Sequence, residues 1–108
     1  MEKAHELVLA IYRVTSKLPR EERFGLTSQM RRSAISVAAN IAEGFKRKGL
    51  KDKINFYNMS PGSLSELQYY LILVNDLKYI NDLVKTRYLC DEIGRMLNGL
   101  IASIERLT

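Results

Sequence analysis

Two glycines in the stretch GFKRKGLK, Gly44 and Gly49, have the spacing of a phosphate-binding P-loop. The P-loop pattern G-x-x-x-x-G-K-[ST] also needs a lysine directly after the second glycine, which reaches the phosphates, and then a hydroxyl residue for the metal ion. Leu50 stands at the lysine position and Lys51 at the hydroxyl position. The pattern fails at both chemically active positions, so nucleotide hydrolysis at this loop is not expected.

The same stretch is the most basic part of the chain. Residues 46–53 contain five cations opposed only by Asp52, whereas the rest of the chain has twelve cations and eleven anions. This segment therefore accounts for +4 of the formal net charge of +5. The five cations are Lys46, Arg47, Lys48, Lys51 and Lys53.

The basic segment has two interpretations. It is either a solvated loop that keeps the protein soluble, or a site for phosphates, because concentrated positive charge attracts polyanions such as nucleic acid. Phe45 and Phe56 flank the cluster, but they fit the apolar rows of the chain better than a base-stacking platform. Any nucleic-acid binding is therefore expected to follow the backbone and shape more than the sequence.

Residues that could perform catalysis or hold a metal are few. Glu2 and His5 form a Glu-x-x-His pair, but the di-iron sites of four-helix bundles need two such pairs and two further glutamates, and His5 is the only histidine. Cys90 is the only cysteine, which excludes an intramolecular disulfide and a cysteine-based zinc site. We expect no metal, no cofactor and no enzymatic activity; an unrecognised carboxylate or tyrosine site is a weaker alternative.

Four segments repeat apolar residues with a helical period, and none alternates as a strand does. The first begins at Ala4 and is expected to stop near Leu18, since Pro19 cannot donate the next backbone hydrogen bond. The second segment carries a seam of the kind found in helical bundles: Leu26, Met30, Ala34, Val37, Ile41 and Phe45. Beside it runs a row of Ile35, Ala38 and Ala42, which would let another backbone approach closely.

The third segment runs from Ile54 to Leu77 and contains Pro61, which disfavours an unbroken helix. The apolar row resumes in register, so we expect one element that is kinked or interrupted; alternatively, Ser60 caps a new helix with Pro61 at its first position. Asn81 and Asp82 can cap the fourth helix. Its expected seam is Leu89, Ile93, Met96, Leu100, Ile104 and Leu107.

A row of polar residues shares one face of the second helix. One interpretation of such a row is a stripe of side chains exposed to solvent. The competing interpretation is a surface pressed against another helix or subunit, where small polar side chains allow close approach and hydrogen bonding. Because apolar rows lie on the adjoining faces, the second helix has little surface left for solvent, which favours oligomerisation. The row is Gln29, Ser33, Ser36, Asn40 and Glu43.

The chain has 108 residues, of which 46% are hydrophobic and 27% charged, as in a single soluble domain over residues 1–108. Its longest apolar run, YYLILV, is far below the ~20 residues that span a bilayer, and its N-terminus does not resemble a secretory signal. We expect a cytoplasmic protein without a membrane anchor. Four amphipathic helices with short connections predict an all-α, antiparallel up-down-up-down four-helix bundle.

Three short motifs, QMRRSAIS from Gln29, NIAEG from Asn40 and GSLSEL from Gly62, resemble the four-helix bundle family of 23S ribosomal RNA intervening-sequence proteins. The resemblance implies a bacterial protein of this fold, for which no reaction is established in the family. A relative is the accessory variability protein of diversity-generating retroelements, which resembles a basic pentameric ring that binds nucleic acid and a reverse transcriptase. Pro61 departs from the expected helical pattern.

By this analogy the chain is expected to form a homo-oligomer, a pentamer, and to present Arg31, Arg32 and the cations of residues 46–53 to nucleic acid. A reverse transcriptase is a possible protein partner. Asn40, Glu43 and Gly44 belong to the NIAEG motif, for which we expect a structural role at the end of the second helix, with Gly44 as a left-handed cap. The alternative function is a protein-interaction scaffold with no nucleic-acid role.

Overall fold

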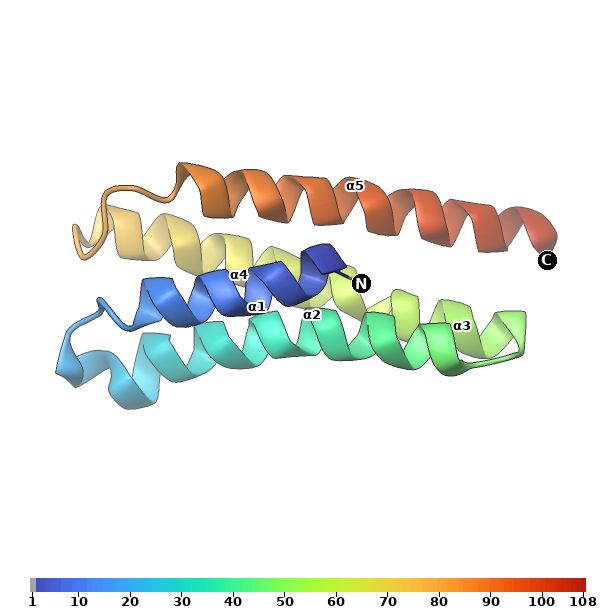
Figure 1. Cartoon of the computed structure of the whole chain (residues 1–108), viewed down its shortest axis with the longest axis horizontal. Helices are drawn as coiled ribbons and strands as arrows, with labels where there is room; N and C mark the ends of the chain where they lie inside the picture. The colour runs from blue at the N-terminus through green and yellow to red at the C-terminus, as the bar shows by residue number, and fades with distance from the viewer. Residues whose placement is uncertain (1) are drawn as a thin grey trace.

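The computed structural model describes residues 2–108, which form helices and no strand. Four long elements run antiparallel in up-down-up-down order, as predicted, when α3 and α4 are counted as one bent element (Figure 1). The bundle measures 46 × 23 × 19 Å. The helices are α1 (Glu2–Thr15), η1 (Arg20–Glu22), η2 (Arg23–Thr27), α2 (Ser28–Lys46), α3 (Leu50–Tyr57), α4 (Met59–Asp76) and α5 (Val84–Leu107).

The core is formed by the apolar rows that the period predicts for α1, α2 and α4. The predicted row from Leu26 in η2 to Ile41 in α2 is buried, but Phe45 is half-exposed in the last turn of α2, which extends beyond the N-terminus of α1 (Figure 1). In α5 the predicted seam is confirmed at Ile93 and Ile104, but Cys90 and Leu97 are buried in place of Leu89 and Met96. Leu89 and Met96 are only partly buried, and Leu89 lies on the side of α5 that faces α1.

The third predicted helix is interrupted, but not by Pro61. α3 ends at Tyr57 and α4 begins at Met59, with Asn58 between them. Pro61 lies in the first turn of α4, where backbone N–H groups have no partner within the helix, so its missing donor costs little. The alternative in which Ser60 caps a new helix is wrong, because its hydroxyl donates instead to the Val37 carbonyl at 3.0 Å.

Two other helix ends differ from the sequence-based expectation. α1 ends at Thr15, and turn hydrogen bonds carry the chain on to Leu18. α5 begins after Leu83, and neither Asn81 nor Asp82 caps it. The bundle therefore relies on buried side chains more than on capping to fix these ends.

Gly44 is not a left-handed cap. It lies inside α2, has no positive φ angle and is buried against the ring of Tyr57 from α3. A Cβ atom at this position would lie less than 3.0 Å from three atoms of that ring. Glycine is required here because the aromatic ring occupies the space of a side chain.

We therefore predict that Gly44→Ala lowers the free energy of unfolding by about 1–3 kcal/mol, the usual cost of overpacking a core. Gly62→Ala is the matched control, because that helical glycine has open space around its Cβ position and alanine favours the helix by up to ~1 kcal/mol. Urea denaturation of the two variants measures the difference. Equal stability of both variants would contradict the close packing of Tyr57 on α2.

Candidate nucleic-acid interface

The basic segment lies at one end of the bundle, where α2 ends and α3 begins (Figure 1). One of its cations folds back onto the protein: the Lys53 Nζ donates to the carbonyls of Gly44 at 3.1 Å and Phe45 at 3.2 Å. These are carbonyls of the last turn of α2, the negative end of the helix dipole. Lys53 therefore caps α2 and is partly used by the fold.

Glu43 holds two further cations of the segment. Its carboxylate lies 3.2 Å from the Arg47 guanidinium and 4.0 Å from the Lys46 ammonium. The Arg47 guanidinium also stacks 4.7 Å from the centre of the Phe56 ring, which joins α2 to α3. All these groups remain solvent-exposed or half-exposed, so the ion pairs are weak.

Lys48 and Lys51 are the free cations of the segment. Both are exposed, and within residues 2–108 neither side chain makes an ion pair or a hydrogen bond. Lys51 lies in the first turn of α3, and Lys48 lies in the extended connection before it. These two ammonium groups are the ones most available to an anion.

Arg31 and Arg32, which the sequence analysis also expects to face nucleic acid, lie apart from the basic segment. They lie in the first turns of α2, so fourteen residues or about 21 Å of helix separate Arg32 from Lys46. Arg31 is also occupied: its Nε donates to the Thr15 hydroxyl at 2.8 Å, and its guanidinium lies 4.3 Å from the centre of the Tyr12 ring. Arg31 thus ties α1 to α2.

The polar row of α2 packs against α4. The Ser33 hydroxyl donates to the Glu66 carboxylate at 2.5 Å, and the hydroxyls of Ser36 and Ser63 are 2.8 Å apart. Together with the bond from Ser60, these contacts pair two rows on facing helices. The fold therefore shows that this row contacts another helix, and that this helix is α4 of the same chain. The missed signal was the matching spacing of Ser60, Ser63 and Glu66.

The other members of the row and of the NIAEG motif have local contacts. Asn40 Nδ2 donates to the Ser36 carbonyl at 2.9 Å and Oγ at 3.2 Å, which orients that hydroxyl towards α4. Gln29 is exposed and takes no part in the network.

The Glu66 carboxylate also affects a neighbour on its own helix. The pKa of Tyr70 is raised by its partial burial and by this carboxylate.

The remaining residues considered for catalysis or metal binding are Cys90, Glu2 and His5. Burial raises the pKa of the Cys90 thiol to about 12, with a smaller effect from Asp91, so this thiol stays protonated at neutral pH. Among residues 2–108 no three histidine, cysteine or acidic side chains gather in a way that could hold a metal ion. Glu2 and His5 are both exposed on α1. No helix in this described part is long and apolar enough to cross a membrane.

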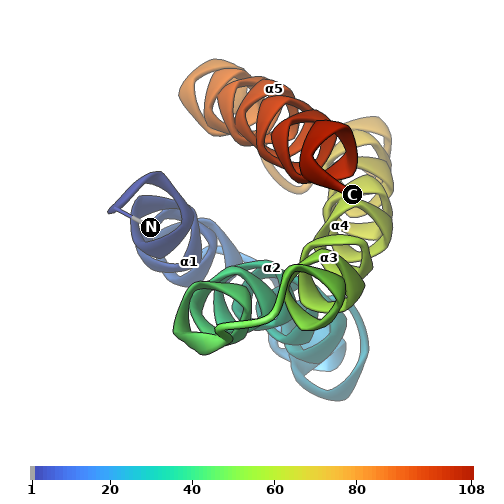
Figure 2. The same ribbon diagram turned by 90° about the vertical axis from the view of Figure 1, so that its right-hand side faces the viewer.

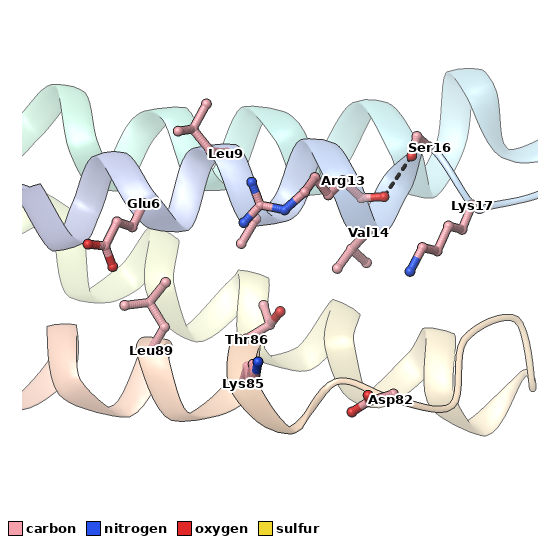
Figure 3. A pocket seen from close by; sticks show the side chains of 11 residues that line it. Glu6, Leu9, Arg13, Val14, Ser16, Lys17, Asp82, Lys85, Thr86 and Leu89 are labelled. Atoms are coloured by element: carbon pink, nitrogen blue, oxygen red, sulfur yellow. Dashed lines mark hydrogen bonds between the residues drawn. The ribbon is translucent and has the colours of Figure 1, made fainter.

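A groove between α1 and α5 was not predicted from the sequence. Its volume is about 690 Å³, and side chains of α1 and of the first turns of α5 line it (Figure 3). Leu9, Ala10, Val14 and Leu89 supply its apolar surface. The charged side chains along it are Glu6, Arg13, Lys17, Asp82 and Lys85.

The comparisons with known proteins place this four-helix bundle in a family. The family model described as 23S rRNA-intervening sequence protein matches residues 1–99, so the chain belongs to that family. A solved structure is similar over 93% of this chain and 95% of its own, with 27% identity and a TM-score of 0.85. It is a protein of unknown function from the S23 ribosomal protein family of Bacteroides thetaiotaomicron. No curated protein matches the chain.

We predict that Ser33→Ala lowers the free energy of unfolding by about 1 kcal/mol, since it removes the donor to Glu66 from a buried position between α2 and α4. Ser65→Ala is the control, because Ser65 lies in the same GSLSEL motif but is exposed. Chemical denaturation followed by circular dichroism measures both. A loss no larger than that of the control would show that the hydrogen bond adds nothing to the stability of the bundle.

Proposed function

We propose that this protein is a non-enzymatic, oligomeric four-helix bundle that binds the backbone of nucleic acid, RNA or a structured DNA/RNA intermediate, through residues 46–53. The observation that carries the proposal is the concentration of five cations at one end of the bundle, with Lys48 and Lys51 exposed and free of internal partners. Phosphate contacts of this kind supply most of the affinity of sequence-independent binding.

Repetition of the segment in a homo-oligomer strengthens the proposal. Two or three phosphate contacts per chain give weak binding at physiological salt, but contacts from several copies add in their effect on affinity. The family resemblance favours a pentamer, and a reverse transcriptase is the protein partner that it suggests. Family membership supports a role close to RNA by name alone.

A protein-interaction scaffold is the second candidate function. It is favoured by the large apolar side chains that remain exposed, above all Phe24 and Val84, with exposed fractions of 86% and 74%. Such side chains are common in protein interfaces when they are held in place. Under this alternative the basic segment only solvates its end of the bundle.

Reversal of the two free charges separates the candidates. We expect Lys48→Glu with Lys51→Glu to weaken binding of a fluorescent RNA at least tenfold at ~50 mM salt, because each copy loses its two available phosphate contacts. The fold should be kept, since a glutamate in the first turn of α3 suits the helix dipole. Lys46 and Arg47 are left unchanged because reversal there would place charges of the same sign beside Glu43.

The matched control is Lys78→Glu with Arg95→Glu, which changes the net charge equally at exposed positions outside the basic segment. Fluorescence anisotropy measures the affinity of both variants. An equal loss in the two variants would show that net charge alone attracts RNA, and unchanged binding by the first variant would contradict the proposal.

A further inference from the structure

Phe24 is an exposed aromatic side chain on a fixed turn. With an exposed fraction of 86% it is the most exposed large apolar residue in the described part of the chain. It lies in η2, the short turn that leads into α2, and the Arg23 guanidinium lies 5.8 Å from the centre of its ring. A single exposed apolar side chain is ordinary on a surface, so the question is whether the turn holds it rigidly.

Two hydrogen bonds to Glu22 hold this turn. One carboxylate oxygen accepts from the Leu26 backbone N–H at 3.3 Å, and the other accepts from the Tyr79 hydroxyl at 3.1 Å. Leu26 itself is buried in the core. Phe24 is therefore presented to solvent by a turn that is anchored on both sides, which lowers the entropy cost of docking it.

The charges around Phe24 favour a protein surface as its partner. Arg20 and Arg23 are offset by Glu21 and Glu22 in the same turn, so the surroundings have no net charge that would attract phosphates. An aromatic anchor beside arginine, within a rim of both signs, is the usual composition of an interface hot spot.

The groove between α1 and α5 offers a site of matching chemistry. Leu9 and Leu89 lie between Glu6 on one side and three cations on the other, with Asp82 near the end of the groove (Figure 3), and none of these charged side chains makes an ion pair within residues 2–108. These cations are Arg13, Lys17 and Lys85. Glu21, which precedes Phe24 by three residues, is likewise without an ion pair in this part of the chain. With about 690 Å³, the groove has room for an aromatic side chain and its neighbours.

The Phe24 side chain cannot reach the α1–α5 groove of its own molecule. Seen along the bundle, the turn at residues 20–27 lies on the far side of α2 from the space between α1 and α5 (Figure 2). Both features nevertheless lie at the same end of the bundle, opposite the basic segment (Figure 1). A neighbouring copy that lies alongside in the same direction would bring its turn to the level of this groove.

We propose that Phe24 of one copy inserts into the α1–α5 groove of the next copy, with Glu21 facing Arg13 and Lys85. This rests on the oligomeric part of the proposed function. Because the two surfaces differ, the contact is heterologous and closes into a ring when the rotation between copies permits. All basic segments then lie at one end of the ring, clear of the contact.

The test is the mass of Phe24→Ser and Leu9→Arg variants by light scattering after size exclusion, without nucleic acid. Each variant alone is expected to be monomeric, since Phe24→Ser removes the inserting side chain and Leu9→Arg places a charge in the groove. Both residues are exposed, so both variants should keep the thermal midpoint of the unchanged protein. A mixture of the two should form dimers only, because the Leu9→Arg chain still carries Phe24 and the Phe24→Ser chain still has an unchanged groove.

Tyr69→Ala is the control, since Tyr69 is 58% exposed on α4 and should leave the assembly intact. The inference is overturned if Phe24→Ser keeps the mass of the unchanged protein, if the mixture fails to form dimers, or if the unchanged protein is monomeric. It is also overturned if Phe24→Ser keeps its mass and loses RNA binding, which would make Phe24 a base-stacking residue. Loss of RNA binding by the Lys48 and Lys51 variant, with its mass unchanged, tests the basic segment separately.

Discussion

The contact between α2 and α4 is the interaction on which the rest of the structure depends. Hydroxyl groups on α2 meet Ser63 and Glu66 on α4, and Ser60 bonds the backbone of α2. Small polar side chains let the two helices approach closely, and because each polar group has a partner, burial leaves none unsatisfied. The same hydrogen bonds fix the register of the two helices, since a slip would separate the paired groups.

This register determines where the basic segment lies. With α4 set against α2, the short helix α3 that precedes it must fold over the end of α2, where the Tyr57 ring fills the space left by Gly44. Lys53 then reaches the last carbonyls of α2, and Arg47 lies between Glu43 and Phe56. The remaining cations, Lys48 and Lys51, point their charge at solvent because the fold gives them no partner. The functional proposal thus follows from the packing of one helix pair.

The apolar period was enough to predict the fold class and most of the core, because helices in a bundle bury one stripe each. In α5 it predicted Ile93 and Ile104 correctly but chose Leu89 and Met96 in place of Cys90 and Leu97, since a residue facing an open groove resembles one facing the core. The role of Gly44 was wrong for a different reason: the need for a small residue came from Tyr57, a contact that depends on tertiary packing. For the same reason the stacking of Arg31 on Tyr12 could not be predicted, because it joins residues nineteen positions apart.

The measurement that tests the central claim most directly is the affinity of the purified protein for RNA and for duplex DNA over a range of salt concentrations, with the oligomeric mass determined in parallel. An oligomer that engages the free lysines of several copies should give a log-log slope of several units, at about −0.9 per neutralised phosphate on duplex DNA. Absence of binding at ~50 mM salt, where backbone contacts are strong, would contradict the account and leave the basic segment as a solvated end of the bundle.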